Sequence, residues 1–329
     1  MKPRTTRRKS GLLAVLSCLL LLLWSPHAPA QDQPAGKLRI FTCGHSFHMW
    51  LPGSLQEVEA LTDIKGHEQL GISRIGGSRV IQHWNVPDDQ NQAKKALEAG
   101  TVDVLTLSPM YTPDEGIVNF AKLGLEHNPK IRVTVQEFWL PHDRLSAMGE
   151  HFFDKEEKEL RVWQNPPQPP PPPNTRGPNP DTSHFNVPTA EQIRKLHEPY
   201  FKNMDAYVAA QNKQFGKQVL FVVPVGQAVV ALREKIIEGK APEITKQSQL
   251  FTDTLGHPNV VIMTLSAYCH YAVIYHRNPV GLPVPASLAK KHPGKELNRL
   301  LQELAWDAVI HHPLSGVTAD AAPAPAAAK

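Results

Sequence analysis

The sequence predicts an α/β domain in which a parallel sheet carries helices on both of its faces. Five short apolar runs alternate with longer segments in which apolar residues recur at helical spacing. The third run, 102–107, is apolar almost throughout, which is typical of parallel strands buried on both faces. Strands separated by helices need crossovers, and right-handed crossovers place helices on both sides of the sheet. The 329 residues, 41% of them hydrophobic, are enough for one large domain or two small ones.

The first thirty residues are predicted to be a signal peptide that lies outside the domain. A start with five lysines and arginines precedes a leucine-rich stretch over 11–24, and Ala28-Pro29-Ala30 fits a cleavage site. The apolar stretch is short for a membrane span. We therefore expect cleavage after Ala30, export to the periplasm or out of the cell, and no stable membrane span in the mature chain.

The charge balance argues against nucleic-acid binding. The formal net charge of +4 includes the five basic residues of the predicted signal, which has no acidic residue, so the mature chain is close to neutral. Such a chain offers no basic surface for a polyanion. Its two cysteines, Cys43 and Cys269, lie far apart and predict buried thiols, with a single disulfide as the alternative in an oxidising compartment.

Each element follows from its apolar pattern and from the turn residues around it. The predicted strands are 38–42, 70–75, 102–107, 131–138 and 219–225. The predicted helical segments are 54–62, 79–84, 88–99, 114–125, 189–215, 228–238, 260–277 and 296–310. Asp88 is expected to cap its helix, and Thr189 with Gln192 fits a capping box. Segment 260–277 is apolar nearly all round, so we expect a buried helix.

A proline-rich segment at 163–188 interrupts the pattern, with five consecutive prolines at 169–173. Such a run cannot donate to a sheet and favours an extended conformation, so we interpret it as a surface excursion. Strands and helices continue after it, and too little chain remains for a second core. One domain over 37–315 is therefore predicted, followed by a disordered Ala/Pro-rich tail at 318–329.

Two polar stretches could carry chemistry. Ser46 stands in Cys43-Gly44-His45-Ser46, on a turn directly after the first predicted strand. Open α/β sheets place their sites at the carboxyl ends of strands. Asp253 and His257 share the loop before the buried helix. A serine, an imidazole base and a carboxylate that orients the imidazole are the groups that acyl transfer needs.

The ordered set of Gly-x-Ser after the first strand, Gly76-Gly77 after the second, and Asp253 with His257 before a helix resembles the SGNH (GDSL-like) hydrolases. This resemblance implies a flavodoxin-like three-layer sandwich with strand order 2-1-3-4-5. It implies Ser46 as nucleophile, His257 as base and Asp253 as its orienting partner. It also implies oxyanion donors from the Ser46 backbone and from Gly77.

The sequence departs from that family's pattern in three places. His45 replaces the usual Asp or Asn before the serine, and the Asp-x-x-x-His spacing is one residue longer. The third strand is not followed by Gly-x-Asn, which leaves Ser108 as the candidate for a third oxyanion donor.

The resulting prediction is an exported serine hydrolase of carboxylic esters, of which deacetylation of a carbohydrate is one example. No cofactor and no metal are predicted, and the oligomeric state is left open. Residues expected near the same edge of the sheet are candidates for substrate contact: His45, Trp139, His142 and Gln227. The alternatives are a non-catalytic binding protein on a degenerate scaffold of this kind, and a metal-dependent protein that uses Cys43, His45 and His48.

Overall fold

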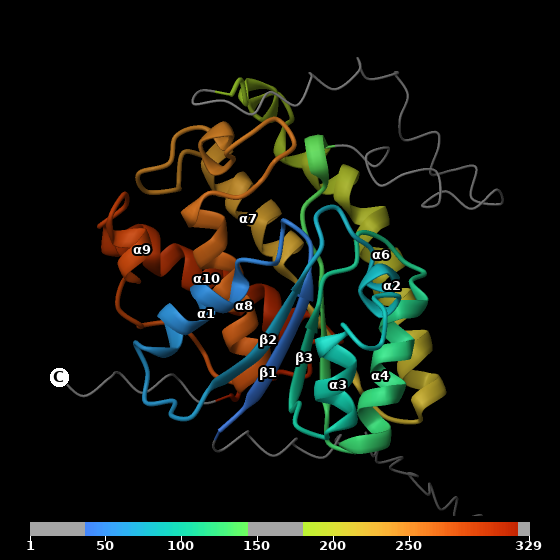
Figure 1. The fold of residues 1–329 in the computed structure, drawn as a ribbon. Helices are drawn as coiled ribbons and strands as arrows, with labels where there is room; N and C mark the ends of the chain where they lie inside the picture. The colour runs from blue at the N-terminus through green and yellow to red at the C-terminus, as the bar shows by residue number, and fades with distance from the viewer. Residues whose placement is uncertain (1–36, 144–179, 322–329) are drawn as a thin grey trace, which may run out of the picture. The chain divides into compact units, whose positions relative to one another are not determined.

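A five-stranded parallel sheet with the order β2-β1-β3-β4-β5 organises the chain (Figure 1). The computed structural model describes residues 37–143 and 180–321. The strands are β1 (Arg39–Gly44), β2 (Glu68–Arg74), β3 (Val104–Leu107), β4 (Arg132–Gln136) and β5 (Leu220–Val223). Both the predicted fold class and the predicted strand order are confirmed.

Helices cover both faces of this sheet, as Figure 1 shows. On one face lie α1 (Leu51–Glu59), α7 (Val225–Ile237), α8 (Val260–Tyr275), α9 (Ala286–Ala289) and α10 (Lys295–His311). On the other face lie α2 (Val80–Trp84), α3 (Gln92–Glu98), α4 (Glu115–His127) and α6 (Ala190–Phe215). The loops of the described residues contain three short 3-10 turns, η1 (Pro141–Asp143), η4 (Ser183–Asn186) and η5 (Gln247–Leu250).

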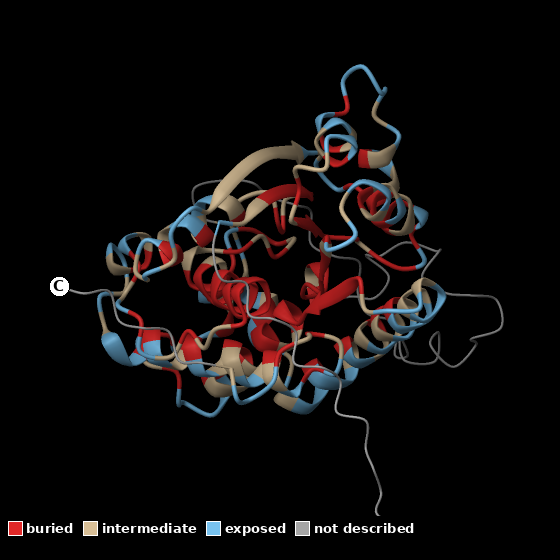
Figure 2. Cartoon of the chain, turned by 90° about the horizontal axis from the view of Figure 1, so that it is seen from below, coloured by how far each residue is buried: buried red, intermediate tan, exposed pale blue. Residues whose placement is uncertain are grey.

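Helix α8 is the centre of its layer. All of its residues except Val260 and Met263 are buried, in agreement with the apolar pattern. Asn259 begins the helix, because its side-chain oxygen accepts the backbone N–H of Val261 at 2.9 Å. Figure 2 shows the buried residues gathered in the inner strands and helices, with exposed ones around them.

Several boundaries differ from the predictions for local reasons. Helix α3 begins after Asn91, whose Oδ1 accepts Lys94 N at 3.0 Å, so Asp88 is not its cap. Helix α1 begins at Leu51, with Pro52 in its first turn, where proline is tolerated. The capping box of Thr189 and Gln192 is confirmed at the start of α6.

Cys43 and Cys269 are both buried free thiols, as expected. Among the described helices, none combines the length and the apolar character that crossing a membrane requires. The predicted signal peptide, the residues up to 179 of the proline-rich segment and the end of the tail from 322 lie outside the described residues.

Candidate active site

Ser46 lies on a tight turn at the carboxyl end of β1. The carbonyl of His45 accepts the N–H groups of His48 and Met49 at 2.9 and 2.8 Å, which reverses the chain. A Cβ atom at Gly44 would lie 2.5 Å from Cδ2 of His48, so this turn requires glycine. Ser46 is half-buried, and its backbone N–H makes no hydrogen bond to any described residue.

His45 supports this turn from inside the protein. Its Nδ1 accepts the N–H of Phe47 at 3.2 Å, and its Nε2 lies 3.2 Å from Ser108 Oγ. Burial, aided by neighbouring histidines, lowers the pKa of His45 to about 3, so the ring is neutral. His45 is buried, and because its Nδ1 is an acceptor, the neutral ring donates from Nε2 to Ser108 Oγ, so this bond does not use the hydroxyl hydrogen of Ser108.

A buried polar network lies beneath the turn. Gln136 donates from Nε2 to the Phe47 carbonyl at 3.0 Å. Its Oε1 lies 2.8 Å from His48 Nδ1 and 2.9 Å from His270 Nε2. His45 faces Ser108 whereas His48 faces Gln136 and Thr106, so Cys43, His45 and His48 do not converge as metal ligands would.

Asp253 and His257 form a pair despite their longer spacing. Oδ1 of Asp253 accepts the backbone N–H groups of Gly256 and His257 at 3.0 and 3.1 Å, and Oδ2 lies 2.6 Å from Nδ1 of His257. Gly256, at φ +96°, gives the turn the conformation that brings the carboxylate and the ring together. Burial raises the pKa of Asp253, but the hydrogen bonds from His257 and Gly256 outweigh it and hold the pKa below its usual value.

The loop that carries this pair is fastened to the end of β4. The indole N–H of Trp139 donates to the Gly256 carbonyl at 2.8 Å, and the N–H of His142 donates to the Leu255 carbonyl at 3.0 Å. Phe251 and Pro258 form a β-bridge that closes the loop. Trp139 is fully buried, so it supports the loop and is not exposed for the substrate contact that the sequence predicted.

The serine turn and the histidine loop meet through Phe47. Its ring centroid lies 5.1 Å from that of His257 and 5.0 Å from that of Trp139. Ser46 is therefore the direct neighbour in sequence of the residue whose ring contacts His257. No hydrogen bond joins Ser46 to His257 within the described parts of the chain. Catalytic hydrogen bonds are often long in proteins without ligand and tighten when substrate binds.

The loop after β2, which contains Gly77, starts from the same edge of the sheet as the serine turn. The N–H of Ile75 donates to the Gly44 carbonyl at 3.4 Å, which links this loop to the start of the serine turn. Gly77 is exposed at φ +61°, and no atom lies within 4 Å of where its Cβ would be. Its backbone is thus accessible from solvent.

Gln227 belongs to a different group of polar residues. Its Nε2 lies 3.0 and 3.3 Å from the two carboxylate oxygens of Glu137, directly after β4. Asp205 and His312 join this group, and neither was identified from the sequence, because both lie far from Glu137 along the chain. Burial raises the pKa of Glu137 to about 7, although His312 and Gln227 oppose this shift.

The chain was compared with family models, curated protein sequences and solved structures. No family model and no curated protein sequence matches the chain. Among solved structures, a DUF4886 family protein from Bacteroides uniformis is similar, with 14% identity and a TM-score of 0.46, over 84% of this chain and 95% of that one.

Proposed function

We propose that the protein is a serine hydrolase of carboxylic esters, with Ser46 as nucleophile and His257 as its base. The observation that carries this proposal is the 2.6 Å contact between Asp253 Oδ2 and His257 Nδ1 beside the serine turn. With its proton on Nδ1, the imidazole presents Nε2 as a proton acceptor. The His257 side chain is 16% exposed, so a substrate can reach it.

In this mechanism Ser46 Oγ attacks the ester carbonyl while His257 Nε2 takes its proton, and His257 then protonates the leaving alcohol. Asp253 stabilises the imidazolium that forms between these steps. The Ser46 amide and the Gly77 backbone supply the oxyanion donors, each of which is worth about 3 kcal/mol in comparable sites. Water then hydrolyses the acyl-enzyme with His257 again as base.

A protein exported through a signal peptide would meet esters outside the cytoplasm, and acetylated carbohydrates are one such class. His142 is the remaining half-exposed residue among the expected substrate contacts near the histidine loop. We therefore include His142 as a contact to the part of the substrate beyond the ester bond.

The test is hydrolysis of p-nitrophenyl acetate by the purified protein. We expect turnover that Ser46→Ala abolishes and that Ser54→Ala leaves unchanged, because Ser54 is also half-buried but lies on α1. Equal turnover in the Ser46→Ala variant would remove this serine from the mechanism.

The second candidate is a non-catalytic binding protein on the same scaffold. The observation in its favour is that no hydrogen bond joins Ser46 to His257 among the described residues. This candidate predicts no turnover by the wild-type protein and unchanged ligand binding in Ser46→Ala.

A further inference from the structure

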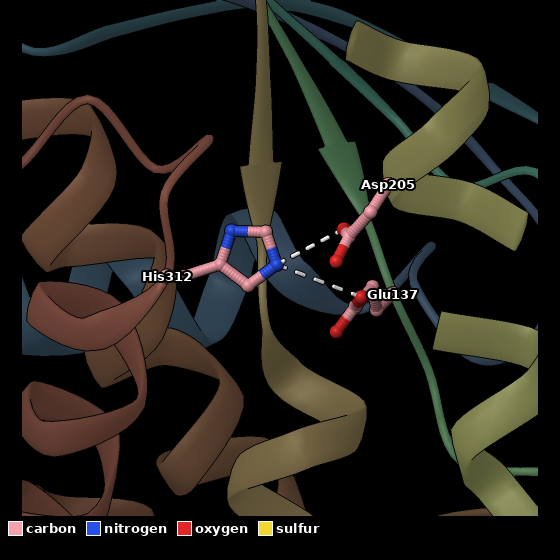
Figure 3. A group of neighbouring side chains, drawn as sticks. All are labelled: Glu137, Asp205 and His312. Atoms are coloured by element: carbon pink, nitrogen blue, oxygen red, sulfur yellow. Dashed lines mark ion pairs between the residues drawn. The ribbon is translucent and has the colours of Figure 1, made fainter. Parts of the chain in front are cut away.

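We propose that Glu137, Asp205 and His312 bind a divalent transition-metal ion such as Zn²⁺, in a site separate from Ser46. Glu137 follows β4, Asp205 lies on α6 and His312 follows α10. Figure 3 shows the three side chains pointing toward one another from these separate elements. One ligand atom from each lies within 4.8 Å of the other two.

The spacing of the three groups suits an ion of this size. His312 Nε2 lies 3.1 Å from Asp205 Oδ1 and 3.8 Å from Glu137 Oε1. Ligand atoms about 2.0–2.1 Å from a tetrahedral zinc ion are about 3.3 Å apart. Small side-chain shifts therefore bring all three atoms into the first coordination shell.

The imidazole nitrogen in the middle is buried without a proper hydrogen bond. His312 has a side-chain exposure of 2%, and neither its Nε2 nor Asp205 Oδ1 makes a hydrogen bond of acceptable geometry to a described residue. Nε2 instead points between the two carboxylates (Figure 3). An ion placed between these three groups gives His312 Nε2 and Asp205 Oδ1 a partner, which is what buried polar atoms require.

The charges near the site also favour a cation. In the described chain, both carboxylates form their ion pairs with His312, and no lysine or arginine pairs with Glu137 or Asp205. The two basic side chains that line the adjoining cavity are already paired, Arg194 with Glu234 at 2.7 Å and Lys202 with Glu198 at 2.5 Å. Buried carboxylates need a paired charge or a metal.

A cavity gives access to the site. It has a volume of ≈ 590 Å³ and is lined in part by Asp205, Gln227 and Phe201. The Asp205 side chain is 32% exposed whereas Glu137 is fully buried, so an ion enters past Asp205. Three protein ligands beside a cavity leave the fourth position for water or a small ligand.

Binding at Nε2 has a local consequence at Leu314. The N–H of Leu314 donates to Nδ1 of His312 at 3.2 Å, so without an ion the ring proton lies on Nε2. An ion that binds Nε2 displaces this proton, and a neutral ring then holds its proton on Nδ1. The hydrogen bond from the Leu314 N–H to Nδ1 of His312 must then break.

The experiment is titration of chelator-treated protein with Zn²⁺, followed by calorimetry. We expect one equivalent of Zn²⁺ to bind, and Mg²⁺ to bind far more weakly because it does not favour imidazole. Asp205→Asn should lower the affinity for Zn²⁺ by more than the roughly 10–100-fold that is lost when a residue that only supports a metal ligand is replaced. Glu198→Gln is the matched control, since Glu198 lines the same cavity outside the cluster. Asp253→Asn is a second control and leaves zinc binding unchanged.

A nuclear magnetic resonance titration gives a second readout that does not depend on a folding-sensitive variant. The Leu314 amide and the His312 ring nitrogens shift together on addition of Zn²⁺. Absence of stoichiometric binding, or binding that Asp205→Asn leaves intact, overturns the site. Neither result bears on ester hydrolysis, because Ser46→Ala is expected to bind Zn²⁺ like the wild-type protein.

Discussion

Asp253 has two separate roles in the proposed site, one for each of its carboxylate oxygens. Its Oδ1 holds the loop through two backbone N–H groups, and its Oδ2 holds the ring of His257. Asp253→Asn keeps an oxygen for the loop but presents an amide to Nδ1, which favours the wrong tautomer. We expect the ester turnover number to fall roughly a thousandfold or more, with little loss of folding.

Asp307 provides the matched control for that substitution. Asp307 and His311 repeat the Asp-x-x-x-His spacing on the exposed surface of α10, at 3.1 Å. Asp307→Asn should leave steady-state kinetics with p-nitrophenyl acetate unchanged. A similar fall in both variants would show that the effect of Asp253 is unspecific.

Gln136 is the residue on which the support of the serine turn depends. Its replacement by leucine leaves His48, His270 and the Phe47 carbonyl without their shared partner. Each buried group left unpaired costs about 1–3 kcal/mol, so the free energy of unfolding in urea should fall by at least about 2 kcal/mol. Gln218→Leu removes one hydrogen bond of a half-buried side chain and should cost about 1 kcal/mol or less. Equal effects of the two substitutions would contradict this account of the network.

Among the elements, α8 connects the core to the histidine loop. Asn259 caps α8 through Val261 N and also donates from Nδ2 to the Gln249 carbonyl at 2.6 Å, which closes the loop that holds Asp253 and His257. Asn259→Ala should lower the free energy of unfolding by about 1–2 kcal/mol. Thr189→Ala, at the exposed start of α6, removes a cap without a loop contact and should cost less, about 1 kcal/mol. Urea unfolding of both variants measures the difference, and a larger loss in Thr189→Ala would contradict it.

The elements were largely predictable because each has a local cause. The alternation of apolar strands and helices, the capping box at Thr189 and the all-round apolar pattern of α8 are local signals, and the structure confirms them. The start of α3 was not predictable from the sequence, because Asp88 and Asn91 are both good caps and only the tertiary structure decides between them. Asn91 caps α3 because its Nδ2 also donates to the His83 carbonyl at 2.9 Å, which fixes the side chain at the start of the helix.

At the scale of the whole molecule, the parallel sheet gathers polar residues at one edge. Ser46, Gly77, Ser108 and Glu137 each follow a different strand, and their approach could be expected from the topology. Their partners could not be predicted in the same way. Ser108 turns to His45, and Glu137 meets Asp205 and His312, because tertiary packing alone brings these groups together.

Buried neutral histidines make the whole fold sensitive to acid. His197 donates from Nδ1 to the Ile193 carbonyl at 2.9 Å and accepts the N–H of Leu140 at Nε2, at 3.0 Å. Burial lowers its pKa to about 4 from the ordinary value of 6.5. Between these values the unfolded chain binds more protons, so the free energy of unfolding falls as the pH falls.

We expect His197 alone to account for a loss of about 2 kcal/mol between about pH 7 and about pH 5. His197→Gln keeps an acceptor but does not titrate, so its stability should depend less steeply on pH. Urea unfolding at several pH values tests this, and parallel profiles for the two proteins would contradict it. His48 and His83, whose pKa values burial also lowers to about 4, contribute in the same direction in both proteins.

The most direct measurement of the proposed chemistry is reaction of the protein with a fluorophosphonate, which labels serines activated by a base. We expect one adduct per molecule, located on Ser46 by peptide mass spectrometry, and no adduct in His257→Gln. A wild-type protein that stays unlabelled, or an adduct that forms equally well without His257, would contradict it.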